Sequence, residues 1–294
     1  MSAAPARHQV VSTAPAAQRF SRTIAKMRGL TAGWNRLGNQ TAFYVRALTL
    51  VWDAIARYKA ETLRLIAGMS LGVGALAIIG GTVVVVTTLV MSTGSFVGIQ
   101  LYRSLSDIGV EALSGFASAY INTRFAAPLT AAIGLAATIG AGATAQLGAM
   151  RINEEIDALE VMGIRAISYL VSTRIVAGVI VTVPLWCLSS LAGYLATRTL
   201  VVVAFGQAPG VYDHYFQTYL QPTDLIWSLL QVMVTATIVM LIHTYYGFNA
   251  SGGPAGVGEA VGRSVRASLT VAVSVQLAVA MAAYGVSGNF NLSG

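Results

Sequence analysis

The sequence predicts an all-α integral membrane protein with an N-terminal amphipathic helix and about five transmembrane helices. Of its 294 residues 55% are hydrophobic and only 10% are charged, whereas a soluble domain carries roughly 25% charged residues. Five stretches without any charged residue are each long enough for a spanning helix, which needs about 20 apolar residues. These stretches are residues 65–102, 125–150, 175–197, 225–258 and 267–294.

The N-terminal region is basic and lacks an apolar core. Residues 1–38 are rich in Ala, Ser, Pro and Arg, which predicts a flexible cytoplasmic tail without a cleavable signal peptide. Residues 39–64 predict an amphipathic helix that lies in the membrane interface, with its apolar residues on one face. That face consists of Tyr44, Leu48, Val51, Ile55 and Tyr58. The alternative is a cytosolic helix that packs on the spanning helices.

Residues 65–294 form the predicted membrane domain. Its spans are expected near residues 68–98, 126–148, 175–197, 225–247 and 267–287. The first charge-free run is long for one span, so that helix is expected to tilt or break. Two segments, 103–124 and 206–224, are predicted to lie outside the membrane, and a Gly-rich segment at 249–266 precedes the last span. Small residues four apart in the second span favour close helix packing within the chain. They are Ala136, Gly140, Thr144 and Gly148.

The distribution of positive charge predicts the orientation. Ten of the 18 Lys and Arg residues precede residue 65, and most of the others fall between spans on the same side. Because positive charge accumulates on the cytoplasmic side, the N-terminus is expected in the cytoplasm and, after an odd number of spans, the C-terminus outside. The predicted location is the plasma membrane, with multiple passes.

Several kinds of site are absent from the sequence. The only lysines, Lys26 and Lys59, do not follow a glycine, so the chain lacks the Gly-Lys element of a phosphate loop. No nucleic-acid motif accompanies the basic region. We expect Cys187 to be a buried thiol and His243 to be a hydrogen-bonded packing residue. Arg174 is expected to extend toward the cytoplasmic surface.

The segment at 142–164 carries the strongest functional signal, because a small-residue span continues there into a charged helix at 150–164. Ile152, Ile156 and Leu159 make one apolar stripe, and Gly163 is placed to cap the helix. Ala158, Val161 and Met162 lie on other faces, together with four acidic residues. Two contact surfaces on a short helix are suited to docking a cytoplasmic partner, although a solvated connecting helix is the alternative.

This segment resembles the cytoplasmic coupling helix of the MlaE/YrbE family, the permeases of Mce-type lipid ABC transporters. The matching residues are Ala145, Leu147, Gly148, Met150, Arg151, Glu154, Ile156, Asp157, Ala158, Leu159 and Met162. The resemblance extends over about residues 60–290, including Thr173-Arg174 and the Gly-rich 252–258. Gln146, Phe125 and the pair Ala137-Thr138 depart from the MlaE pattern. With the C-terminal Tyr284 to Asn291, these departures make the chain most similar to the YrbE subunits of actinobacterial Mce systems.

The resemblance implies a permease subunit of an ATP-driven lipid importer, without an ATP site or cofactor of its own. A second YrbE-type chain would complete a heterodimer, a cytoplasmic ABC ATPase dimer would bind ATP and Mg, and Mce proteins would bind outside. Fatty or mycolic acids are the expected substrates, and sterols come next. Arg124 matches a basic position of the family, so we expect it to meet an anionic lipid headgroup, with an interface anchor as the alternative. The residues expected to couple to the ATPase are Arg151, Glu154, Glu155, Asp157, Leu159, Glu160 and Met162.

Two other classes of function remain open from the sequence. An ion-coupled secondary transporter usually needs carboxylates inside its spans. No Asp or Glu lies inside the predicted spans, which counts against this class. A passive membrane scaffold for an envelope assembly is the other alternative.

Overall fold

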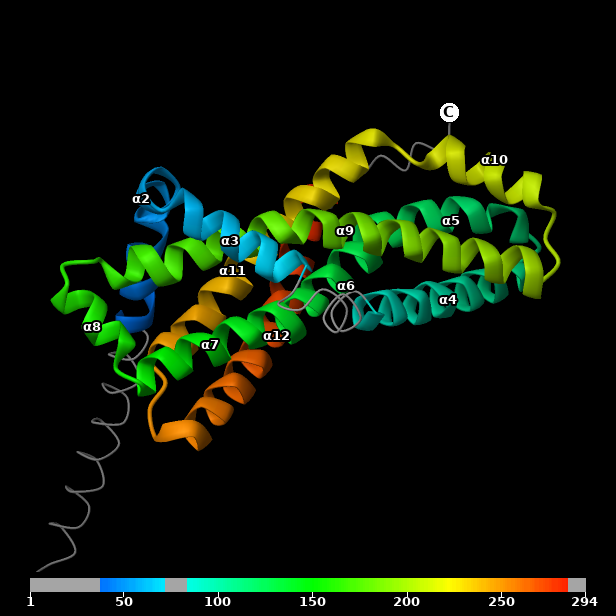
Figure 1. Ribbon diagram of the computed structural model, residues 1–294. Coiled ribbons are helices and arrows are strands. Elements are labelled where there is room, and N and C mark those ends of the chain that lie inside the picture. The colour runs from blue at the N-terminus through cyan, green and yellow to red at the C-terminus, as the bar shows by residue number, and fades with distance from the viewer. Residues whose placement is uncertain (1–37, 72–83, 285–294) are drawn as a thin grey trace, which may run out of the picture. The chain divides into compact units, whose positions relative to one another are not determined.

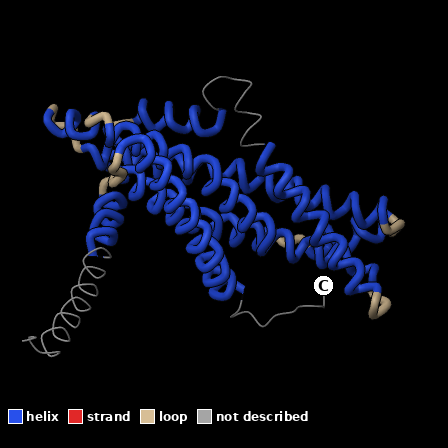
Figure 2. The backbone as a smooth tube through the Cα atoms, turned by 90° about the horizontal axis from the view of Figure 1, so that it is seen from below, coloured by secondary structure: helices blue, strands red, loops and turns tan. Residues whose placement is uncertain are grey.

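A computed structural model describes residues 38–71 and 84–284. The chain divides into two units at Val45 and Arg46. In the first unit, residues 38–45 are helical. The described residues of the second unit are almost entirely helical, with short loops at the helix ends (Figure 2). The predicted tail at 1–38 falls outside the described residues except for Gly38.

Within each described range, the helices of the second unit follow one another with short connections (Figure 1). They are α2 (Val51–Arg57), α3 (Lys59–Leu71), α4 (Val84–Ser106), α5 (Ser114–Ile121), α6 (Ala127–Gly134), α7 (Ala141–Ile152), α8 (Glu155–Val161), α9 (Thr173–Thr199), α10 (Pro209–Tyr219), α11 (Pro222–Phe248) and α12 (Gly253–Tyr284). Short 3₁₀ or π segments join several of them: η2 (Glu111–Leu113), η3 (Asn122–Ala126), η4 (Leu135–Gly140), η5 (Ile167–Ser172) and η6 (Leu200–Ala204).

Five helical runs are long and apolar enough to cross a membrane, which confirms the predicted all-helical membrane fold. They are Val84–Ser106, Glu111–Ile152, Ile167–Ala204, Pro222–Phe248 and Gly253–Ala282. The bounds differ from the prediction. The first candidate span is described from Val84 and extends past residue 98 to Ser106. Residues 72–83 of the predicted span lie outside the described part of the chain.

The second span begins earlier than predicted. Residues 111–124, expected outside the membrane, belong to a continuous helical run with α7. Polar side chains in this part find partners on neighbouring helices: the Asn122 amide donates to Thr197 Oγ1 at 2.9 Å, and the Thr123 hydroxyl lies 2.6 Å from the Tyr194 hydroxyl. A charged or polar residue therefore does not mark the end of this helix, because packing against other helices satisfies it.

Two further segments that were placed between the predicted spans are largely helical. The Gly-rich segment at 249–266 mostly belongs to α12, which begins at Gly253. The segment at 206–224 contains α10, which packs against α5. Tyr212 of α10 is buried, and its carbonyl lies directly against Gly115 of α5, where any larger residue would clash. Tertiary contacts here override weak local helix signals.

The amphipathic region is divided into shorter helices, and α3 runs through the predicted domain boundary at residue 64. Within the predicted amphipathic region, Ala47 and Ala54 are buried, whereas Leu48 and Ile55 of the predicted apolar face are exposed. The Ser172 hydroxyl donates to the Ala47 carbonyl at 2.8 Å, and α3 packs on α9. The region thus packs on the membrane helices through small residues and through Tyr58, whose ring centre lies 5.1 Å from that of Tyr169, while Leu48 and Ile55 stay exposed.

The predicted small-residue stripe of the second span is confirmed as packing within the chain. All four of its residues are buried. A Cβ atom added at Gly140 would lie 2.5 Å from the His243 ring, and one at Gly148 would lie 2.8 Å from Val257. These close approaches bring α11 and α12 against the second span, as small residues do in lipid.

Two expectations about exposure were wrong. Cys187 is exposed on α9 instead of buried, because the buried positions of α9 lie on its other sides and Cys187 falls on its apolar outer surface. Arg174 is only 5% exposed instead of extended to the surface. Its guanidinium donates to the Leu170 carbonyl at 2.8 Å, so local backbone takes the place of water.

Candidate functional site

The first candidate site is the connection between the second and third spans, at one end of the unit (Figure 1). The predicted single helix at 150–164 is in fact broken: α7 ends at Ile152, and α8 begins at Glu155. Glu154 has a φ of 59° in the left-handed region, which non-glycine residues rarely adopt. This turn changes the chain direction, so that α8 can fold back on the bundle while its other face stays free.

One face of α8 packs against its own membrane domain, as predicted. Ile156 is fully buried in a cluster with Leu147 and Leu170, and Leu159 packs against the same cluster. The end of α8 is fixed by two backbone hydrogen bonds of 3.0 Å, from Gly163 N to Glu160 O and from Ile164 N to Leu159 O. Gly163 has a φ of 77°, so it caps the helix in a Schellman motif as expected.

The side of α8 turned away from the cluster is exposed. Its C-terminal end is apolar, since Val161 is 89% exposed and Met162 is 66% exposed. Glu155, Asp157 and Glu160 of the same helix are also exposed. A short helix that is anchored on one side and presents apolar and acidic residues on the other is the arrangement that a docking surface requires.

Arg151 does not stand free beside these acids. Its guanidinium pairs with the Asp157 carboxylate at 2.6 Å across the turn between α7 and α8. Both side chains are partly exposed, so the pair contributes little to stability. It does fix the orientation of the turn and leaves Glu155 and Glu160 as the exposed acids of the outer face.

The second candidate site is an ion pair inside the candidate spans. The guanidinium of Arg124, in η3, makes three contacts of 2.9 to 3.1 Å with the Asp224 carboxylate in the first turn of α11. The side chains are 18% and 13% exposed. Arg124 also lies over the rings of Tyr120 and Tyr284, at 4.0 and 4.5 Å from their centres. This bidentate ion pair lies between two aromatic rings and connects the second span to α11 and α12.

The pair bears on one prediction and corrects another. Arg124 was expected to meet an anionic lipid headgroup, which stays a prediction; in this structure its guanidinium is paired with Asp224. Asp224 was placed just outside the fourth span, whereas α11 begins at Pro222 and contains it. A carboxylate therefore does lie inside a candidate span. The sequence signal that could have placed Asp224 inside the helix is the segment Pro222-Thr223-Asp224. Pro and acidic residues favour the first turn of a helix.

A buried polar network joins α7, α11 and α12 near the first site. The His243 ring lies 2.9 Å from the Thr144 hydroxyl and 2.9 Å from the Ser268 hydroxyl. Thr144 also contacts Ser264 at 3.1 Å. Both ring nitrogens of His243 thus have partners, which confirms its role in packing. The network ties α7, which leads into α8, to the last two spans.

A third ion pair connects α10 to the last turn of α9, where Arg198 lies. The Arg198 guanidinium makes two contacts, of 2.7 and 2.8 Å, with the Asp213 carboxylate. These hydrogen bonds hold the pKa of the Asp213 carboxyl below its ordinary value. Among the described residues, no three His, Cys, Asp or Glu side chains gather in a way that would hold a metal ion.

In the part of the chain that the structure describes, five candidate spans, a partly anchored helix between the second and third of them, and an ion pair within the bundle define a multi-pass membrane protein. The family model of the permease MlaE matches residues 73–282. The chain therefore belongs to the MlaE permease family.

Curated proteins from bacteria and a plant are similar to this chain. A probable ABC transporter permease protein of Rickettsia felis is 29% identical over 192 residues, which cover 62% of this chain and 71% of the relative. A protein of the same description from Synechocystis is 29% identical over 181 residues, covering 60% and 69%. The chloroplastic protein TRIGALACTOSYLDIACYLGLYCEROL 1 of Arabidopsis thaliana is 27% identical over 181 residues, covering 60% of this chain and 52% of the plant protein. The chain thus spans about half the length of the plant relative.

Proposed function

We propose that this chain is the permease subunit of an ATP-driven lipid transporter of the Mce type, most similar to the YrbE subunits. With a second permease chain it forms an apolar pathway for lipids across the plasma membrane, and ATP is hydrolysed by a partner ATPase. The match to the MlaE permease family over residues 73–282 carries this proposal. The bacterial relatives are described as probable ABC transporter permeases, and the plant relative is named for a galactolipid.

The outer face of α8 is the proposed contact with the ATPase. Val161 and Met162 supply apolar area, and Glu155 and Glu160 supply charge around it. Movement of α8 would pass through Ile156 into the cluster with Leu147 on α7. From α7 the polar network at His243 connects to α11 and α12, so one rigid path joins the docking surface to the spans.

The Arg124–Asp224 pair is the proposed control point within the pathway. An anionic headgroup of a fatty or mycolic acid would compete with Asp224 for the guanidinium, because both are carboxylates with the same geometry. External energy is required for lipid release, since each buried methylene stabilises a bound tail by about 0.8 kcal/mol. Mce proteins on the outer side and lipid import are part of this proposal.

The alternative of an ion-coupled transporter gains a carboxylate inside a span, at Asp224. However, both oxygens of Asp224 are bonded to Arg124, so they are not available to a coupling ion while the pair is intact. A passive scaffold would show no transport that depends on ATP.

The decisive experiment is purification of the intact complex in mild detergent, followed by reconstitution and measurement of lipid transfer with and without ATP. The double variant Glu155→Lys and Glu160→Lys should reduce the amount of ATPase that co-purifies at least fivefold. The matched control is Asp107→Lys, an exposed acid beyond the end of α4. The end of α4 and α8 lie toward opposite ends of the unit (Figure 1).

Three outcomes would count against the proposal. Normal ATPase recovery in the double variant would remove the acidic outer face of α8 from docking. Equal loss in the Asp107 control would make the effect one of general charge. Lipid transfer that does not respond to ATP would exclude an ATP-driven permease.

A further inference from the structure

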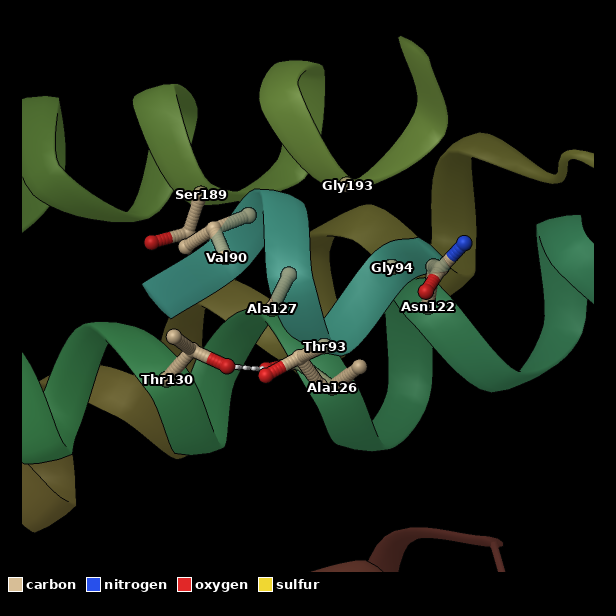
Figure 3. A pocket seen from close by; sticks show the side chains of 9 residues that line it. All are labelled: Val90, Thr93, Gly94, Asn122, Ala126, Ala127, Thr130, Ser189 and Gly193. Carbon is tan, nitrogen blue, oxygen red and sulfur yellow. Dashed lines mark hydrogen bonds between the residues drawn. The ribbon is translucent and has the colours of Figure 1, made fainter. Parts of the chain in front are cut away.

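A narrow cleft lies between α4, α6 and α9, and it contains two buried polar atoms without partners. Figure 3 shows the nine residues that line it. The side-chain oxygen Oδ1 of Asn122 and the hydroxyl of Ser189 have no hydrogen-bond partner within the described structure. Asn122 is 1% exposed and Ser189 is 0% exposed. Buried polar groups are nearly always paired, so two such atoms in one cleft require an explanation.

The hydrogen bonds around Asn122 fix which end of its amide is free. The Thr197 hydroxyl donates its proton to the Gly94 carbonyl at 2.8 Å, so it can only accept from Asn122, at 2.9 Å. The atom that faces Thr197 must therefore be the amide nitrogen Nδ2. That nitrogen also reaches Ser118 at 3.1 Å. The free atom is thus an acceptor, and the missing partner is a hydrogen-bond donor.

The free oxygen faces the space in front of a glycine. A Cβ atom added at Gly193 would lie 3.9 Å from Asn122 Oδ1 and 3.7 Å from Val90. Ser189 lies one turn earlier on α9, about 6 Å along the axis. The two unpartnered groups therefore lie along one face of α9, with the Gly193 gap beside the first.

No charged residue lines the cleft. Arg124 is two residues from Asn122, but its guanidinium is turned to Asp224 on α11. The rim is formed by partly exposed Thr93 and Ala126, and Phe96 on α4 is 66% exposed nearby. An uncharged cleft with an apolar approach from a spanning helix excludes an anionic group and favours a neutral polar group carried by a lipid.

We propose that this cleft binds the hydroxyl group of an uncharged lipid, which donates its proton to Asn122 Oδ1, while Ser189 hydrogen-bonds a second polar oxygen of the same lipid. The identification of the ligand as a lipid rests on the proposed function. In the present conformation the cleft has no room for a water molecule. Entry of the hydroxyl therefore requires the Val90 side chain, which lines the cleft, to move, and the unpaired atoms disfavour the closed state until a ligand satisfies them.

The test is photolabelling of the full-length chain in phosphatidylcholine nanodiscs, without nucleotide. The probe is a monoacylglycerol with a diazirine in its acyl chain, which offers hydroxyl donors and an ester oxygen. The comparison probe is the corresponding fatty acid methyl ester, which has no hydroxyl. Labelling by the monoacylglycerol should saturate, should map to α4, α6 or α9, and should exceed labelling by the ester.

Two variants test the two ends of the cleft. Gly193→Ala places a methyl group over Asn122 Oδ1 at ordinary contact distances, so it should fold normally and weaken apparent affinity about fivefold. Ser189→Ala should have an effect of similar size, since one hydrogen bond of about 1 kcal/mol corresponds to about fivefold. The controls are Ser190→Ala, whose hydroxyl is already bonded to the Trp186 carbonyl, and Gly142→Ala, which has open space.

Equal labelling by the two probes, labelling that maps to other helices, or unchanged affinity in both cleft variants would overturn the inference. Thermal unfolding of each variant verifies that any loss of affinity occurs in folded protein. Because no ATPase or nucleotide is present, a failure of ATP-driven transport leaves this result standing. Conversely, ATP-driven transport with no specific labelling would refute the cleft and not the transporter.

Discussion

The Arg124–Asp224 pair should be among the strongest single interactions between spans, and a double-mutant cycle measures it. We consider Arg124→Met, Asp224→Ala and the double variant. Both side chains are less than a fifth exposed and share three contacts of 2.9 to 3.1 Å. Removing one partner of a buried pair costs about 3 to 5 kcal/mol, because the other charge is left without compensation.

The expected cost of Asp224→Ala lies at the lower end of that range, about 3 kcal/mol. In this variant the guanidinium keeps its contacts with the rings of Tyr120 and Tyr284, which retain about 0.5 to 2 kcal/mol. Arg124→Met removes these contacts as well and should lose about 5 kcal/mol of unfolding free energy. The double variant leaves no unpaired charge and should lose no more than Arg124→Met, which gives a coupling energy of at least about 3 kcal/mol.

The unfolding free energies of all four proteins are measured by reversible unfolding with sodium dodecyl sulfate in mixed micelles. Tryptophan fluorescence reports the extent of unfolding. Only the cycle separates the interaction from the effects of shortening each side chain. A double variant whose loss equals the sum of the two single losses would refute the reasoning. The two charges would then be energetically independent, and Arg124 could bind a lipid headgroup without competition from Asp224.

Three other predictions follow from single positions. Gly140→Ala should destabilise the fold by about 1 to 3 kcal/mol because its methyl group would meet the His243 ring at 2.5 Å, whereas Gly142→Ala, with open space, should be neutral or slightly stabilising in thermal unfolding. Glu154→Gly should raise the unfolding free energy by about 1 kcal/mol, because glycine tolerates a φ of 59° without strain; a loss of stability would show that the carboxylate is needed there. The depressed pKa of Asp213 means that its ion pair is fully formed above the ordinary Asp pKa and is lost as the pH falls through the lower folded value. The protection factors of the α10 amides, which are corrected for the intrinsic pH dependence of exchange, should therefore fall in acid, and Asp213→Asn should remove that fall.

The sequence predicted features that depend on long averages or on local chain chemistry. Charge-free runs of sufficient length indicated five membrane helices, and the structure has five candidate spans. The helical spacing of Ile152, Ile156 and Leu159 indicated which side of α8 would be buried. Gly163 was identified as a helix cap from its position alone, because a left-handed cap depends on nearby backbone atoms.

The sequence was less informative where distant residues satisfy one another. Charged and polar residues at 111–124 were taken as evidence against a span. Partners about 70 to 100 positions away, Tyr194, Thr197 and Asp224, make a continuous helix possible there. The break at Glu154 was missed for a related reason, since the packing of Ile156 against Leu170 compensates for an unusual backbone conformation.

Composition and local pattern by themselves determined that this chain is a helical membrane protein and which segment was the candidate for docking. Both follow from hydrophobicity and helix periodicity, which are properties of neighbouring residues. Only the tertiary structure decided that Arg124 is neutralised by Asp224 and that Asn122 and Ser189 meet in one cleft. Those facts depend on which helix faces come together, and in a bilayer this is decided by close packing and by the pairing of buried polar groups.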